Sequence, residues 1–253
     1  MKSPYERRIA RAQELVTQFP PSANVLDFYR RVSLLQKTVF EGLVTRADSD
    51  VRTILRHLPP LIDLVKMHGP ARLAEHAGAD LGSQADLGKQ IVAFWDAGTK
   101  TAGIESESLF FARSLLQPYA EYLATRGIPP PSTQEAVCPF CASKPVAGVL
   151  RGEGEGAKRS LVCSLCATEW QYRRIVCPNC GEQDKDRLPV YTAAEIDYVR
   201  LEACDVCKTY IKSVDLTRNG HAVPVVDELA TVALNIWADE NGYAKLETNL
   251  LGM

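Results

Sequence analysis

The sequence predicts an α + small β fold class: an N-terminal all-helical bundle, two small cysteine-bearing β modules in tandem, and a C-terminal helix. Residues 1–128 contain no cysteine and carry apolar residues at helical spacing. All eight cysteines fall within residues 138–210, in short apolar segments that favour β-structure. Helical spacing returns in residues 215–253. With 253 residues, 46% of them hydrophobic, the chain is long enough to bury a substantial core.

An N-terminal capping pattern predicts where the first helix begins. Ser3 is the expected N-cap, Pro4 takes the first helical position, and Glu6 completes a capping box. Two consecutive prolines after residue 19 should end this helix. An apolar stripe then predicts a second helix over residues 24–45.

Further helices complete the predicted bundle, over residues 50–57, after Pro70, over 83–95 and over 106–126. Pro59 and Pro60 should interrupt or restart the first of these, because proline cannot donate a backbone hydrogen bond. Pro118 lies inside the last one and should kink or split it. Since the helices are amphipathic, they must bury their apolar faces against one another.

A proline-rich linker marks the predicted domain boundary, because consecutive prolines make a stiff, extended segment. A single helix over residues 227–240 is predicted near the C-terminus, with Asp227 and Glu228 in its first turn, where they favour the helix dipole. The predicted units are the bundle, the linker, the first module, the second module, and the C-terminal helix and tail, at residues 1–128, 129–137, 138–172, 173–214 and 215–253.

The cysteines form four C-x-x-C pairs: Cys138 and Cys141, Cys163 and Cys166, Cys177 and Cys180, and Cys204 and Cys207. Between successive pairs lie twenty-one, ten and twenty-three residues. A two-residue spacer lets both thiolates of a turn point at one ion, and such repeats are typical of tetrahedral four-cysteine sites. Sequential grouping therefore predicts one metal site from the first two pairs and another from the last two.

Three alternatives compete with this interpretation. The pairs could group crosswise, the first with the third. A disulfide framework would require an oxidising compartment, whereas Arg11 and Glu14 occupy the place where an export signal after Arg7-Arg8 would be apolar. Redox-active pairs of thioredoxin type need a strand-to-helix context that this segment lacks. The chain also has no apolar run long enough to span a membrane, so we expect a cytoplasmic protein without membrane insertion.

The metal cannot be chosen from spacing, because four-cysteine sites accept both zinc and iron. Cys177-Pro178-Asn179-Cys180-Gly181 has the form of a rubredoxin knuckle, in which glycine lets backbone N–H groups approach the sulfur. The other pairs are followed instead by Ala142, Ala167 and Lys208, which argues against a uniform environment. A closed four-cysteine site has no vacant position for hydrolysis, so we expect no catalytic residue and no enzyme.

The sequence beside the cysteines carries a family resemblance. The features are Cys138-Pro-Phe-Cys141 before Pro145 and Gly148; Leu161-Val-Cys-Ser-Leu-Cys166 before Trp170 and Arg173; Cys177-Pro-Asn-Cys-Gly181; Arg200-Leu-Glu-Ala-Cys204 before Cys207, Tyr210 and Lys212; and the C-terminal Glu240-Asn-Gly-Tyr243 and Asn249-Leu-Leu-Gly252. Together they resemble the formate dehydrogenase accessory (formation) protein family, of the FdhE type. The resemblance is detailed over residues 130–253 and general over the helical half.

This resemblance implies a cytoplasmic accessory protein needed to form active respiratory formate dehydrogenase. It implies a helical domain followed by rubredoxin-like modules that bind two metal ions, iron in the first instance, with zinc possible. It also implies binding to the immature catalytic subunit of formate dehydrogenase, which contains selenocysteine and molybdenum. The surface that would bind this subunit is not identified by any motif.

Two other functions fit tandem cysteine modules. A zinc-ribbon nucleic-acid-binding protein would need a basic surface, but residues 138–210 contain ten Lys or Arg against ten Asp or Glu, so we expect no nucleic-acid partner. A rubredoxin-like electron-transfer protein would use an iron site that cycles one electron, and redox sensing of this kind is compatible with the accessory role.

Overall fold

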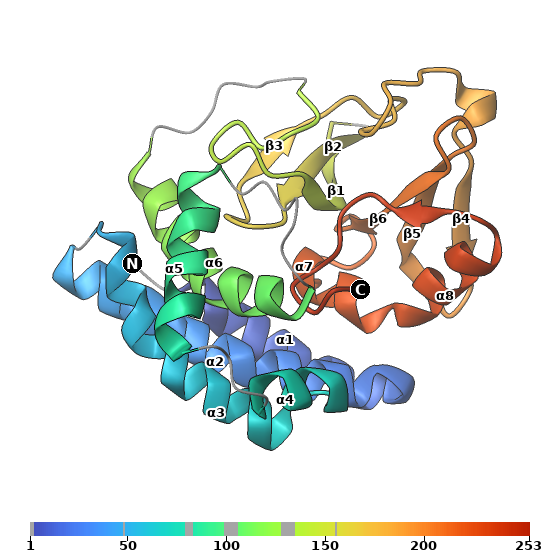
Figure 1. The fold of residues 1–253 in the computed structure, drawn as a ribbon. Helices are drawn as coiled ribbons and strands as arrows, with labels where there is room; N and C mark the ends of the chain where they lie inside the picture. The colour runs from blue at the N-terminus through green and yellow to red at the C-terminus, as the bar shows by residue number, and fades with distance from the viewer. Residues whose placement is uncertain (1–2, 48, 79–82, 99–105, 128–134, 155) are drawn as a thin grey trace.

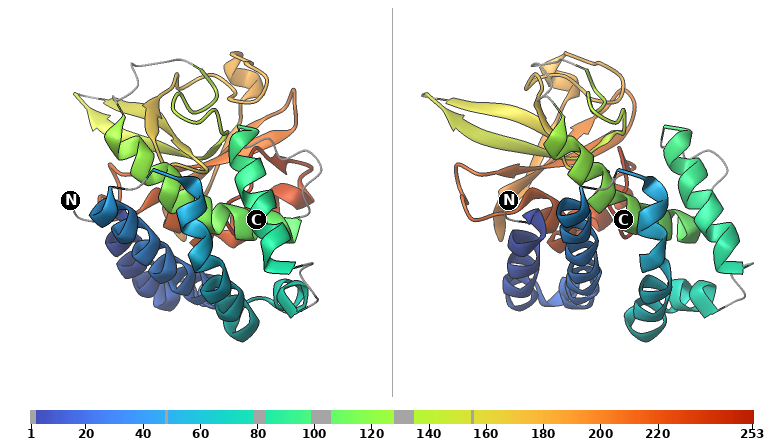
Figure 2. Two further views of the ribbon diagram at one scale, coloured as in Figure 1. Left: turned by 60° about the vertical axis from the view of Figure 1, so that its left-hand side comes forward. Right: turned by 90° about the vertical axis from the view of Figure 1, so that its left-hand side faces the viewer.

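The computed structural model describes residues 3–47, 49–78, 83–98, 106–127, 135–154 and 156–253. Figure 1 shows helices in the lower layer and a β-sheet above them, with α6 and α7 between the two. The views in Figure 2 show the same order of layers from the side. The fold class predicted from the sequence is confirmed: helices come first, then the cysteine-bearing sheet, then the C-terminal helices.

The N-terminal layer is all-helical, as predicted. Its elements are α1 Pro4–Gln18, η1 Pro20–Ser22, α2 Ala23–Arg46, η2 Val51–His57, α3 Leu58–His68, α4 Ala71–Gly78, α5 Ser83–Asp96 and α6 Ser106–Arg126. Ser3 caps α1 by accepting a hydrogen bond from the Tyr5 N–H at 3.3 Å. The Glu6 carboxylate binds Lys37 Nζ of α2 at 3.1 Å. The predicted N-cap is therefore present, and the Glu6 carboxylate joins two helices.

Prolines shape this layer in two ways. Pro59 and Pro60 lie in the first turn of α3, where backbone N–H groups have no helical acceptor, so the helix restarts there. Pro118 does not split α6, which runs unbroken as one helix. Because proline has no N–H, the carbonyl of Ser114 one turn earlier loses its helical donor, and Gln36 Nε2 of α2 donates to it at 3.0 Å. This tertiary hydrogen bond compensates the helix for the proline.

The described strands form one seven-stranded sheet. They are β1 Pro145–Glu153, β2 Gly156–Cys163, β3 Glu169–Gln171, β4 Val190–Ala193, β5 Ile196–Cys204, β6 Thr209–Asp215 and β7 Ala244–Lys245. The order is β3-β2-β1-β6-β5-β4, with β7 beside β6. The first hairpin unit (β1, β2, β3) and the second hairpin unit (β4, β5, β6) are antiparallel internally.

A parallel pairing of β1 with β6 joins the two hairpin units, with Gly148 opposite Ser213. A β-carbon at Gly148 would lie 2.1 Å from the Ser213 hydroxyl oxygen, so only glycine fits this contact without rearrangement. Of the predicted linker, residues 129–137, only residues 135–137 belong to the described part of the chain. The division of the chain into the predicted units stays a prediction.

The C-terminal segment forms two helices where one was predicted: α7 Pro224–Ala230 and α8 Val232–Glu240. The break lies at Thr231, whose φ and ψ are −94° and 48°. Lys212 Nζ donates to the carbonyl oxygens of Glu228 at 2.5 Å and Thr231 at 3.2 Å. The carbonyl groups at the end of α7 thus accept hydrogen bonds from a buried ammonium group instead of from the N–H groups of a further helical turn.

Asp227 and Glu228 are fully buried, a role that helix-dipole reasoning did not predict. Asp227 accepts hydrogen bonds from Arg11 of α1 at 2.6 Å and Tyr198 of β5 at 2.9 Å. Glu228 binds Lys212, Lys245 and Asn249, the first at 3.0 Å. Because buried charges need partners, these two carboxylates tie α7 to the helical layer, to the sheet and to the C-terminal tail.

The larger apolar core joins the N-terminal helices to the first hairpin unit, to α7 and to the tail. A smaller core lies between the second hairpin unit and α8. None of the described helices combines the length and hydrophobicity that a membrane span requires.

Candidate metal centres

The structure brings the eight cysteines together in two sets, each made of two consecutive C-x-x-C pairs. In the first set, Cys138 Sγ lies 3.5 Å from Cys166 Sγ, and Cys141 Sγ lies 3.4 Å from Cys163 Sγ. All four sulfurs lie within 4.8 Å of one another. The hairpin between β1 and β2 returns the chain from the first pair to the second, so the grouping follows from local topology.

The second set has the same form. Cys177 Sγ lies 3.6 Å from Cys207 Sγ, and Cys180 Sγ lies 3.6 Å from Cys204 Sγ. Here the β5–β6 hairpin carries the last pair, and all four sulfurs again lie within 4.8 Å. The first pair therefore neighbours the second, and not the third as crosswise grouping would require.

The sulfur geometry fits a tetrahedral ion. Metal–sulfur bonds of about 2.3 Å place thiolates about 3.8 Å apart, close to the spacing in both sets. All eight cysteines are free thiols, so the disulfide alternative is not the state of this structure. Backbone N–H groups point at the sulfurs, from Leu165 to Cys163 at 3.3 Å and from Asn179 to Cys177 at 3.4 Å. Each set could hold one zinc or iron ion, and thiolate ligands do not discriminate between them.

All four pairs share one backbone turn, although only one is followed by glycine. The residue after the second cysteine has a left-handed φ of 58°, 52°, 79° and 54° at Ala142, Ala167, Gly181 and Lys208. In non-glycine residues this conformation costs roughly 1–2 kcal/mol. The N–H of Ala142 donates to the Cys138 carbonyl at 2.8 Å, and that of Lys208 to Cys204 at 2.9 Å. The absence of glycine therefore does not change the knuckle backbone.

Three hydroxyl groups beside the sulfurs were not predicted from the sequence. Thr168 Oγ1 lies 3.0 Å from Cys166 Sγ, Thr209 Oγ1 lies 3.1 Å from Cys207 Sγ, and Ser143 has the same place beside Cys141. The signal was present as C-x-x-C-x-[ST] in three of the four pairs. Burial raises the pKa of Cys207, but hydrogen bonds with Thr209, Asn179 and Cys180 outweigh it and bring the pKa to about 6. These hydroxyls favour the thiolate form that binds metal.

Four thiols this close cannot ionise together without a cation. Burial, and then the neighbouring thiols of its set, raise the pKa of Cys163 well above its usual value. Hydrogen bonds from Cys138 and the other two cysteines hold the pKa of Cys141 far below its usual range. A divalent ion at the centre would let all four cysteines ionise, because its charge stabilises the four thiolates at once.

Comparison with known proteins agrees with this architecture. The family descriptions "FdhE, central domain" and "FdhE, C-terminal domain" match residues 137–174 and 162–251. A "Protein FdhE homolog" of Aquifex aeolicus is 32% identical over 209 residues, which cover 81% of this chain and 72% of that protein. The chain belongs to the FdhE family.

Other FdhE proteins match smaller or larger parts of the chain. A "Protein FdhE homolog" of Pseudomonas aeruginosa is 40% identical over 124 residues, which cover 46% of this chain and 39% of that protein. The crystal structure of the FdhE protein from Pseudomonas aeruginosa superposes with a TM-score of 0.66 at 25% identity, covering 98% of this chain and 95% of that one. The FdhE fold therefore extends over the helical half, where the motifs showed no detailed resemblance.

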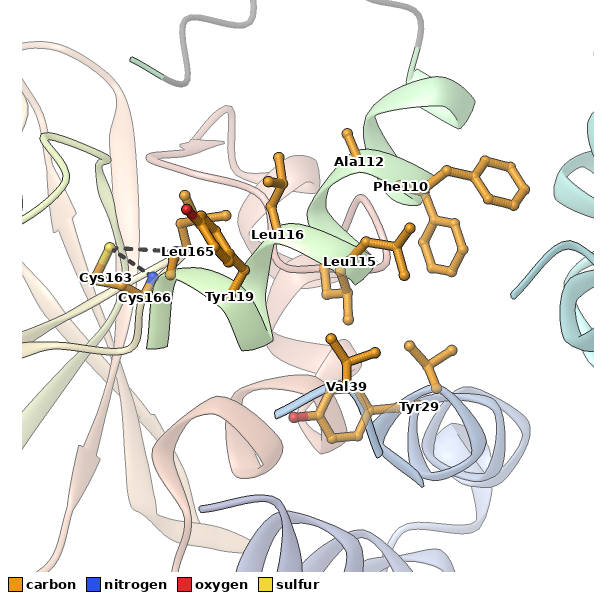
Figure 3. Packing of buried hydrophobic residues seen from close by; sticks show 14 of the residues in the cluster. Tyr29, Val39, Phe110, Ala112, Leu115, Leu116, Tyr119, Cys163, Leu165 and Cys166 are labelled. Atoms are coloured by element: carbon orange, nitrogen blue, oxygen red, sulfur yellow. Dashed lines mark hydrogen bonds between the residues drawn. The ribbon is translucent and has the colours of Figure 1, made fainter. Parts of the chain in front are cut away.

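The two cysteine sets of this FdhE-family chain differ in their surroundings. Three members of the first set are buried, and Cys163, Leu165 and Cys166 belong to the same core as the α6 side chains drawn in Figure 3. Gln117 Nε2, also of α6, donates to the carbonyl oxygen of Ser164 in the same turn at 2.9 Å. The first set is thus part of the larger core and is anchored to the helical layer.

The second set lies at the surface. Cys180 is exposed and Cys207 is partly exposed, whereas Cys177 and Cys204 are buried. Solvent, chelators and oxidants can therefore reach one edge of this set directly. This difference predicts unequal metal retention by the two sets.

Proposed function

We propose that this FdhE-family protein is an accessory protein for the formation of respiratory formate dehydrogenase, and that it binds the immature catalytic subunit of that enzyme in the cytoplasm. The observation that carries the proposal is the pair of closed four-cysteine sets within a fold that matches an FdhE structure over 98% of the chain. Four thiolates around one ion leave no open coordination position, which supports a binding role without turnover.

Each cysteine set is proposed to hold one metal ion. The ligands are Cys138, Cys141, Cys163 and Cys166 for one ion, and Cys177, Cys180, Cys204 and Cys207 for the other. Iron follows from the family resemblance, and zinc satisfies the same donors. When bound, either ion neutralises the crowded thiolates and holds the paired turns in place.

The exposed edge of the second set supports a second, compatible role in redox sensing. An iron ion there would be open to oxidants through Cys180, while the buried first set would be protected. No nucleic-acid partner is proposed, because the cysteine-bearing residues 138–210 carry equal numbers of basic and acidic side chains.

Affinity purification from cells that respire formate without oxygen tests the accessory role. The tagged full-length protein should capture the catalytic subunit of formate dehydrogenase, identified by mass spectrometry, and the yield should fall in cells grown without formate. The tagged protein would be assayed for metal in the same preparation. If the metal-loaded protein captures no formate dehydrogenase subunit, the proposed partner is wrong.

A further inference from the structure

A small cavity lies beside the second cysteine set, where the two hairpin units meet. Its volume is about 60 Å³, and its lining includes Arg159 of β2, Arg174 of the connection after β3, and Arg200 and Glu202 of β5. Two metal-ligand cysteines of the second set also contribute to the wall. At about 10–15 Å³ for each water, the cavity has room for roughly four to six non-hydrogen atoms.

Arg159 is a buried cation with an unused donor. Its side chain is 1% exposed, and its guanidinium carbon lies 5.4 Å from the centre of the Tyr172 ring. Nη1 donates to the carbonyl oxygen of Arg173 at 3.0 Å, and Nη2 pairs with Glu202 at 2.7 Å. Nε has no hydrogen-bond acceptor among the residues that the structure describes. A buried charged donor without an acceptor is costly, so an acceptor is expected at this position.

The cavity has more positive than negative charge in its lining. Glu202 divides its two oxygens between Arg159 and Arg200, at 2.7 Å from each guanidinium. Arg174 forms no ion pair within the described part of the chain. The lining therefore contains three arginines, of which Arg174 is exposed, and one glutamate, which favours an anionic guest.

Much of the remaining lining is apolar, with Val176, Leu188, Val190, Ile211 and Leu246, and Thr209 and Tyr210 add two hydroxyl-bearing residues. A phosphate ion has no apolar part to place against such a wall. We propose that this cavity binds the carboxylate of a ligand with a short hydrocarbon body. The carboxylate could belong to a free short-chain acid or to a polypeptide that docks on this face, and both would use the same guanidinium groups.

The competing explanation is that the arginines only balance the second metal site. A divalent ion with four thiolates carries a net charge of −2, and two of those cysteines lie in the cavity wall. Charge balance alone, however, requires neither an open space nor an apolar wall, and it leaves Arg159 Nε without an acceptor.

Ligand-observed NMR with propionate tests the proposal on the metal-loaded full-length protein. Propionate should bind, and neutral propionamide of the same shape should not. Arg174→Gln should weaken propionate binding about tenfold, the effect of losing one charge-assisted hydrogen bond. Arg173→Gln is the matched control, because its side chain is not part of the lining and should leave binding within twofold of the wild type. Arg159 is left intact, since its removal would break both its ion pair with Glu202 and its hydrogen bond to the Arg173 carbonyl.

A tripeptide ending in a free valine, compared with its amidated form, distinguishes the two sources. Binding of propionate supports a free acid, and binding only of the free-ended peptide supports a polypeptide carboxylate. The proposal is overturned if neither carboxylate binds better than its neutral amide, or if Arg174→Gln and Arg173→Gln behave alike. Loss of metal from Arg174→Gln, in a protein whose wild type binds no carboxylate, would establish charge balance instead. None of these outcomes depends on formate dehydrogenase.

Discussion

Replacing Cys177 and Cys180 together by serine should empty the second cysteine set and leave the first loaded. A structural zinc site contributes about 10–16 kcal/mol of apparent binding free energy at pH 7. That is comparable to the roughly 5–15 kcal/mol that stabilises a whole domain. The second hairpin unit should therefore lose its fixed structure when two of its four ligands are removed.

The damage should remain largely local, because most of the core of the second hairpin unit is separate from the larger core. Val199 and Leu201 of the second hairpin unit pack in the smaller core with Leu234 of α8, whereas Ile211 of β6 belongs to the larger core. The helical layer and the first cysteine set share the larger core. The helices should therefore keep their packing, and partner binding that requires the second set should be lost.

Three measurements check this prediction. Metal analysis should fall from two ions per chain to one, far-UV circular dichroism should keep its helical signal, and limited proteolysis should cut within the second hairpin unit. Lys185→Ala, at an exposed position near the same set, should retain both ions. Retention of two ions by the double variant, or loss of both, would refute the sequential grouping or the independence of the sets.

Three further predictions follow from the geometry. A chelator should remove metal in two phases, the faster one from the second set, because Cys180 is exposed. Glu228→Gln should destabilise the fold by about 3–5 kcal/mol, since it strands two buried lysines. Burial opposes ionisation of Glu228, but those lysines lower its pKa to about 2. Its carboxylate therefore stabilises the wild type above about pH 4.3, and this contribution is lost as the pH falls toward 2. Gly148→Ala should cost about 1–3 kcal/mol, because its β-carbon meets the Ser213 hydroxyl.

Each of these has a control. For the chelator prediction, Cys180→Ser serves as a reference for fast release from the second set. Equal release rates for both ions of the wild type would contradict the prediction. Denaturant unfolding from pH 7 to pH 2 checks the second, with the exposed Glu240→Gln as a neutral comparison. For the glycine prediction, the double variant Gly148→Ala/Ser213→Gly should recover the free energy of unfolding lost in Gly148→Ala. If Gly148→Ala alone is as stable as the wild type, β1 and β6 can move apart at no cost and the prediction is wrong.

The grouping of the cysteines was accessible from the sequence because it depends on local geometry. A two-residue spacer directs two thiolates to one side of a turn, and a hairpin of about twenty residues returns the next pair. Helical periodicity likewise marked the N-terminal layer, since the apolar face of a helix repeats every three or four residues. Family resemblance added the accessory role, which no spacing could supply.

The tertiary structure decided what depends on partners distant in the chain. Pro118 leaves α6 whole because Gln36, far away in sequence, takes up the freed carbonyl of Ser114. The parallel pairing of β1 with β6 places Gly148 opposite Ser213. No local sequence pattern predicts this pairing, because the two strands are far apart in the chain. Asp227 fits a helix-dipole role when considered alone, and only folding brings Arg11 against it. Local geometry depends on residues that are close in the sequence, so the sequence predicts it. A buried polar group needs a hydrogen-bond partner, and which residue becomes that partner depends on how distant segments pack in the folded core.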